Sequence, residues 1–171
     1  FKLAQEQFKL GRVAEARAAL EPLYNSPDPA VRQRPRLEDF KLQMQQMQAM
    51  PANTPQRAKE TERLRQELVA MTQYQWDTAG LTELADVAGQ LQARNLRAQL
   101  YLRIVKTDST LSRQWIDEAA QKVLNDSEYL NAAEIHFAAM GRATTLEDRR
   151  HHFRSAIAGY QAGNMARGAL L

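Results

Sequence analysis

Three histidines are the residues of this chain best suited to acid–base or metal chemistry. His136 stands alone, whereas His151 and His152 are adjacent. Adjacent side chains on a helix point about 100° apart, so we expect that this pair cannot hold one metal ion jointly. Glu134 and His136 are two residues apart and are equally unsuited to share a metal ion, because zinc sites on helices use pairs three or four residues apart. The spacing predicts no metal site, and we interpret His136 as a packed residue of a helix interface.

Nothing else in the sequence indicates catalysis. The chain has no cysteine, which excludes disulfides, thiol catalysis and cysteine–zinc sites. The sequence contains no serine nucleophile motif, phosphate-binding loop or paired-carboxylate signature. Asp117 and Glu118 are simply neighbours that point to different flanks of a predicted helix. We therefore expect a protein that is not an enzyme and needs no cofactor.

Charge and hydropathy narrow the class of partner. The chain has 23 basic and 20 acidic residues, for a formal net charge of +3, and the two signs are interspersed. This balance does not indicate a nucleic-acid partner. The arginines near positions 32–36 and 149–154 are either solvated helix faces or a patch for an anionic partner. No apolar run of about 18 residues is present, so we expect no membrane contact by this segment.

A repeat organises the helices that must position these residues. The stretches 81–106 and 116–140 carry the same apolar pattern at a spacing of about 34–35 residues. The first set is Leu84, Ala85, Ala88, Ala98, Leu102 and Val105, and the second is Ala119, Ala120, Val123, Ala132, His136 and Ala139. Paired helices at this period are typical of tetratricopeptide (TPR) solenoids. The sequence predicts an all-α, TPR-like α-solenoid of stacked antiparallel helix pairs, in a right-handed superhelix.

The predicted units cover the whole chain, 1–171, as one solenoid segment. They span approximately 1–28 (partial), 35–75 (long and atypical), 77–108, 112–142 and 145–171 (truncated). Because Leu170 and Leu171 follow Gly168 in what reads as the start of another helix, we expect a segment of a longer protein.

Several residues predict where helices begin and end. Glycine suits a helix end with positive φ, and serine or threonine suits a helix start. The predicted signals are the turn glycines Gly11 and Gly163, the N-caps Thr54 and Ser112, Pro35 in a first helical turn, and a capping box of Thr144 with Glu147 or Thr145 with Asp148.

An apolar stripe marks the predicted unit 35–75. It consists of Leu37, Phe40, Met44, Met47 and Met50, at spacings of three or four residues. Such a stripe is either core or a soft, protein-binding face. In the second interpretation, the stripe and Trp76, which we expect to be exposed, would together form a surface for protein docking.

The first helices of TPR units line a concave groove, where a partner binds. We expect the following side chains to face it: Thr82, Asp86, Gln90, Asp117, Gln121, Asn125, Arg150, Phe153, Ile157 and Tyr160. Their carboxylates, amides and aromatic rings suit either a peptide or a sugar chain. Asp86 and Asp117 would attract a cationic polysaccharide at short range. The alternative is that they are ordinary solvated positions.

Three segments carry a narrower resemblance. They read WDTAGLTELADVAGQLQARNLRAQLYLRIVKTD, WIDEAAQKVLNDSEYLNAAEIHFAAM and LEDRRHHFRSAIAGYQAGN. Their amino-acid sequences resemble the periplasmic TPR region of PelB-type outer-membrane proteins, which export the Pel exopolysaccharide of biofilms. In that family a periplasmic TPR superhelix precedes an outer-membrane β-barrel. Cellulose and alginate export proteins carry similar solenoids.

The resemblance implies a periplasmic scaffold that recruits a polysaccharide deacetylase/hydrolase and guides polymer to the pore. One alternative is a direct carbohydrate-binding conduit along the concave face. Another is a general peptide-binding TPR module of cytoplasmic type. Such modules clamp a carboxylate with basic residues on successive helices, and the predicted groove positions of 77–108 and 112–142 lack them.

Overall fold

The structure is a computed structural model that describes residues 2–168. Over this range the chain forms nine α-helices and one short 3₁₀ helix, with no β-strand. This confirms the all-α fold class. The chain divides into two compact units, 1–80 and 81–171, and the boundary falls near the start of helix α5 (Thr78–Gln90). The sequence prediction for Leu170 and Leu171 lies outside the described residues.

The first unit begins with a short helix pair. Helix α1 (Lys2–Lys9) and helix α2 (Val13–Leu20) are joined by a turn at Gly11, whose φ of 73° confirms it as a turn glycine. The 3₁₀ helix η1 (Glu21–Asn25) continues α2. Ala16 is completely buried, as expected for a small residue where helices approach closely.

Two longer helices complete the first unit. Helix α4 (Pro55–Met71) begins at the predicted cap, because the Thr54 side chain accepts a hydrogen bond from the backbone N–H of Arg57. Helix α3 (Pro29–Ala49) contains Pro35 in its interior, so the prediction of Pro35 in the first turn is wrong. The helix starts instead at Pro29, where the missing N–H would have had no helical partner.

Most of the methionine stripe is core. Leu37, Phe40, Met44 and Met47 are all at least 95% buried, so these residues are not available as an exposed protein-binding face. Met50, the last residue of the stripe, is half-buried. Trp76 is not freely exposed either. It is half-buried, and its indole N–H donates to the carbonyl of Met71 at 2.8 Å.

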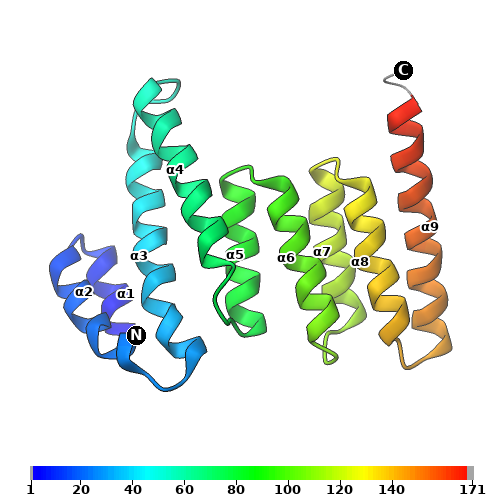
Figure 1. Cartoon of the computed structure of the whole chain (residues 1–171), viewed down its shortest axis with the longest axis horizontal. Helices are drawn as coiled ribbons and strands as arrows, with labels where there is room; N and C mark the ends of the chain where they lie inside the picture. The colour runs from blue at the N-terminus through cyan, green and yellow to red at the C-terminus, as the bar shows by residue number, and fades with distance from the viewer. Residues whose placement is uncertain (1, 169–171) are drawn as a thin grey trace. The chain divides into compact units, whose positions relative to one another are not determined.

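The second unit contains the predicted repeat. Its helices are α5 (Thr78–Gln90), α6 (Arg94–Thr107), α7 (Arg113–Asn125), α8 (Tyr129–Arg142) and α9 (Leu146–Gly168). Figure 1 shows α5 with α6, and α7 with α8, as antiparallel pairs. Helices α5 and α6 span 78–107 and helices α7 and α8 span 113–142, beside the predicted units 77–108 and 112–142. Ser112 caps α7 by accepting from the Trp115 N–H at 3.2 Å, as predicted.

Both helix pairs of the second unit turn in the same way. At the end of α5 the Ala93 N–H donates to the Ala88 carbonyl (2.8 Å), and at the end of α7 the Glu128 N–H donates to the Val123 carbonyl (3.2 Å). The residue before each donor, Gln92 or Ser127, has positive φ. These are Schellman motifs, which satisfy carbonyls that a helix end leaves open. The two motifs lie 35 residues apart, so the first helix of each pair ends in the same way.

The end of the chain departs from the prediction. Helix α9 continues through Gly163 to Gly168, so Gly163 does not form a turn. A Cβ at Gly163 would lie 2.7 Å from a side-chain carbon of Leu130. The glycine therefore serves the close packing of α9 on α8. The start of α9 follows the predicted capping box in its second form, because the Asp148 N–H donates to the Thr145 hydroxyl, which in turn donates to the Asp148 carboxylate.

Candidate functional site

The predicted groove residues of the second unit lie on α5, α7 and α9. Asp86, Gln90, Gln121, Asn125, Arg150 and Phe153 are exposed, whereas Thr82, Asp117 and Tyr160 are half-buried. Many of these side chains bind to one another or to neighbouring helices. Gln121, for example, donates to the Asn125 side chain at 2.9 Å.

Asp86 is paired with a lysine of the following repeat. The Lys122 ammonium lies 3.0 Å from the Asp86 carboxylate and also donates to the Tyr101 hydroxyl at 3.2 Å. The Tyr101 hydroxyl itself donates to Asp86. Burial raises the pKa of Tyr101. Burial alone would lower the pKa of Lys122, but its hydrogen bonds to Asp86 and Tyr101 outweigh that effect and raise it. The negative charge of Asp86 is therefore compensated within the protein.

Asp117 is paired with a histidine of α9. Its two carboxylate oxygens lie 2.8 and 3.0 Å from Nε2 of His151. Behind this pair, Nδ1 of His136 lies 3.2 Å from Nδ1 of His152. Both of the latter rings are buried, with 7% and 2% of their surface exposed. The packed position predicted for His136 is confirmed.

Burial controls the protonation of the inner histidines. It lowers the pKa of His136 to about 4, with the neighbouring His152 adding to the effect and Asp117 opposing it. Burial, followed by the charge of His151, also lowers the pKa of His152. Both rings are therefore neutral at pH 7, and each carries one N–H and one free lone pair.

The expectation that His151 and His152 diverge too far to share a ligand is wrong. Asp117, His151 and His152 each offer one ligand atom, and these atoms all lie within 4.8 Å of one another. The 100° separation along the helix applies to the Cα–Cβ directions, whereas the imidazole nitrogens lie further out and are placed by rotation about the side-chain bonds.

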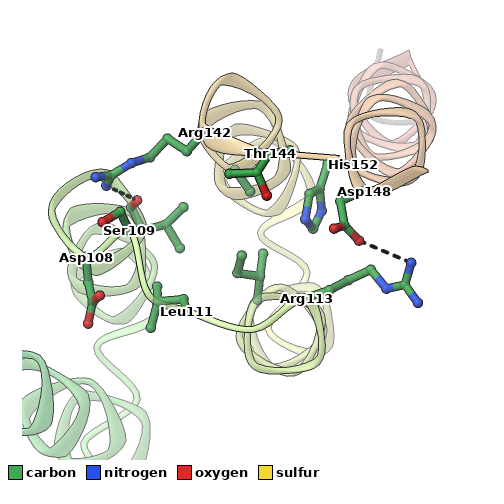
Figure 2. A pocket seen from close by; sticks show the side chains of 12 residues that line it. Asp108, Ser109, Leu111, Arg113, Arg142, Thr144, Asp148 and His152 are labelled. Atoms are coloured by element: carbon green, nitrogen blue, oxygen red, sulfur yellow. Dashed lines mark hydrogen bonds and ion pairs between the residues drawn. The ribbon is translucent and has the colours of Figure 1, made fainter. Parts of the chain in front are cut away.

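A small polar cavity borders this cluster. It has a volume of about 100 Å³, and Arg113, Arg142, Asp148 and His152 are among its lining residues. Figure 2 shows His152 beside Asp148, with Asp148 paired to Arg113. Arg142 donates to the Val105 carbonyl at 2.7 Å.

An apolar and basic surface follows helix α9. Phe153 and Ile157 are 51% and 40% exposed and lie one turn apart on the same face. A hollow at the start of the same helix is lined by Arg113, Leu146, Glu147, Arg150, His151, Arg154 and Ser155. The Tyr160 hydroxyl donates a hydrogen bond to the Glu134 carboxylate of α8 at 2.5 Å. This hydrogen bond raises the pKa of Tyr160 to about 12.

Sequence reasoning missed the partners of both aspartates. Lys122 follows Asp86 by 36 residues, and His151 follows Asp117 by 34. Both separations match the repeat period, so a search for opposite charges one period apart would have found them. The contact of His136 with His152 gives no such signal, because it depends on how α8 and α9 pack.

Comparisons with protein-family models, with curated proteins and with solved structures found no match to this chain. Among the described residues, no helix has the length and apolar character needed to cross a membrane.

Proposed function

We propose that this chain is part of a TPR-like α-solenoid that acts as a non-catalytic, periplasmic protein-interaction scaffold in a Pel-type exopolysaccharide export system. Its partner would be the polysaccharide deacetylase/hydrolase, and the scaffold would help guide polymer to the outer-membrane pore. The sequence resemblance supports this proposal. Further support comes from the matched turns of α5/α6 and α7/α8 and from side-chain contacts at separations of 34 to 37 residues.

The exposed face of α9 carries the proposal. Phe153 and Ile157 are apolar side chains exposed to solvent on one helix face, with Arg150 and Arg154 exposed on the same helix. Aromatic residues and arginines are enriched in protein interfaces. This surface suits a partner that offers an apolar patch with acidic residues around it.

The pairing of the aspartates favours a protein over a cationic polymer. Asp86 and Asp117 are the groove carboxylates that would attract a positively charged polysaccharide. Each already has a cationic or proton-sharing partner, Lys122 or His151, at 2.8 to 3.0 Å. A polymer would have to displace these partners before it gained the electrostatic attraction.

Calorimetry of the 171-residue chain with the deacetylase of a matching export system tests the proposal. We expect micromolar or tighter binding, weakened about tenfold or more when Phe153 and Ile157 are both replaced by alanine. The matched control is Phe137→Ala, because Phe137 is 52% exposed but lies on α8. Oligosaccharides of the polymer are titrated in parallel. Binding to the sugar alone, or equal losses in the control and the double variant, would contradict the proposal.

A further inference from the structure

Four side chains capable of binding metals meet where α7, α8 and α9 pack. Asp117 comes from α7, His136 from α8, and His151 and His152 from α9. Asp117 is 2.8 Å from His151 and 4.0 Å from His136, and the two Nδ1 atoms of His136 and His152 are 3.2 Å apart. The three histidine rings lie with centroids 5.1 to 6.2 Å apart. All three histidines of the chain are in this cluster.

We propose that Asp117, His151 and His152 bind a divalent transition-metal ion, with Zn²⁺ as the best fit, and that His136 positions His152. The three ligand atoms lie within 4.8 Å of one another. Zinc bonds of 2.0–2.1 Å in tetrahedral geometry separate the donor atoms by about 3.3 Å. Small side-chain rotations therefore suffice to bring three donors around one ion, and the fourth position is left for solvent.

The role of His136 follows from the ring nitrogens. A histidine that ligates a metal through one nitrogen usually engages a second group through the other, which fixes the orientation of the ring. His152 makes such a contact through Nδ1, with Nδ1 of His136. This contact leaves Nε2 as the nitrogen of His152 that is free to ligate. His136 thus acts through His152 and does not itself touch the ion.

The surrounding charges are compatible with a cation. Asp117 contributes one negative charge. Arg113 is a cation whose charge acts on His152, but Glu147 and Asp148 compensate it at 3.0 and 3.2 Å. An ion also has a route in, because the side chains of Asp117 and His151 are 37% and 38% exposed.

The donor set selects the kind of metal. Two imidazoles and one carboxylate suit Zn²⁺, Cu²⁺, Ni²⁺ or Co²⁺, whereas Ca²⁺ and Mg²⁺ require a set made mostly of oxygen ligands. A bound ion would join α7 to α9 directly. Its effect on the protein would therefore be to stabilise the packing of α9, independently of the function proposed above.

Titration of the chelator-stripped chain with Zn²⁺ tests this site. We expect one ion per chain with micromolar or tighter affinity, a higher melting temperature, and visible absorption bands of tetrahedral geometry when Co²⁺ is used instead. Asp117→Asn and His151→Gln should each weaken binding about tenfold or more. Both side chains are half-exposed, so both variants should keep their helical content by circular dichroism.

The matched control is Glu118→Gln, because Glu118 is the next residue on α7 but is exposed and accepts from Gln114. It should bind Zn²⁺ as the parent chain does. Calcium serves as a control ion and should not compete. Failure to saturate at one equivalent, or equal affinity in the parent chain and both ligand variants, would overturn the site and leave an ordinary Asp–His pair beside two packed histidines.

Discussion

Two packing interfaces of the second unit, built on the same helix repeat, are held by different chemistry. Where α5 and α6 meet α7 and α8, the polar contacts come from permanently charged residues, Arg97 and Lys122. Where α7 and α8 meet α9, Arg113 pairs with Glu147 and Asp148 at the surface, but the buried polar contact joins His136 to His152. The backbones there approach so closely that a Cβ at Gly159 would lie 2.9 Å from that of Ala133. The repeat therefore sets where helices pack, while the side chains decide whether an interface responds to protons and metals.

The largest effect is expected from Arg97→Ala in the first interface. The Arg97 guanidinium pairs with Asp126, and the two side chains are only 15% and 18% exposed. It also donates to the Lys122 carbonyl. Removing it leaves a partly buried carboxylate without its partner, at a cost of about 2–3 kcal/mol in the free energy of unfolding. Urea denaturation measures this value.

Arg94→Ala is the control for that measurement. Arg94 lies on the same helix but is exposed, so its replacement should change the free energy of unfolding by no more than about 0.5 kcal/mol. Similar losses in the two variants would show that the Arg97 pair does not hold the interface.

Acid should weaken the second interface in the metal-free protein. The unfolded chain protonates His136 with a pKa near 6.5, whereas the folded chain resists until about pH 4. Stability is therefore complete above pH 6.5 and falls as the pH drops toward 4. Between pH 7 and pH 5 we expect a loss of the order of 2 kcal/mol. Asp117 opposes this loss, whereas His151 and His152 reinforce it.

Urea denaturation at pH 7, 6 and 5 in the presence of a chelator measures the acid effect. A His136→Phe variant removes one of the titrating groups and should show a shallower pH dependence than the parent chain. An identical pH dependence in both proteins would contradict the assignment to His136.

Two glycines should respond to alanine with opposite signs. Gly159→Ala brings a Cβ within 3.3 Å of two backbone atoms of Ala133, so α9 must shift and the protein should lose about 1–2 kcal/mol. Gly141→Ala meets nothing within 4 Å and should gain about 0.5 kcal/mol from helix propensity. Thermal melting of both variants shows whether each substitution raises or lowers stability. A stabilising Gly159→Ala would refute the close approach of α8 and α9.

The smallest effect is expected from Asp86→Asn. Asp86 and Lys122 are each 48% exposed, and surface ion pairs of this kind contribute about 0.5 kcal/mol. The change should be undetectable at high salt, because screening already weakens the pair. A loss above about 1 kcal/mol by urea denaturation would mean that the hydrogen bond of Tyr101 to Asp86 holds the interface as well.

The sequence predicted the helices of the second unit well because their signals are local. Apolar periodicity, the Ser112 cap and the Thr145–Asp148 capping box each act within one or two turns. Gln92 and Ser127 were harder to identify as turn residues, since positive φ is usually occupied by glycine. Pro35 and Gly163 misled the prediction, because a residue that suits a helix end can also lie inside a helix when tertiary packing favours it.

The candidate site was less predictable than the fold. The residue types were visible, but the grouping of Asp117 with His151 and His152 depends on how α7 packs against α9. Side-chain rotation then decides whether two adjacent histidines converge, and no sequence spacing encodes it. Phe153 is 51% exposed, as its position outside the apolar stripe of its helix predicts.

The Schellman turns have a consequence for the speed of folding. Each closes its helix pair through hydrogen bonds between residues only three and five apart, as in Ser127 to Leu124 and Glu128 to Val123. Proteins dominated by short-range contacts of this kind have low contact order and reach the folded state quickly. Each helix pair thus forms its turn without help from distant segments. We expect the docking of α9, whose link to α8 contains no residue of positive φ, to be the slower step.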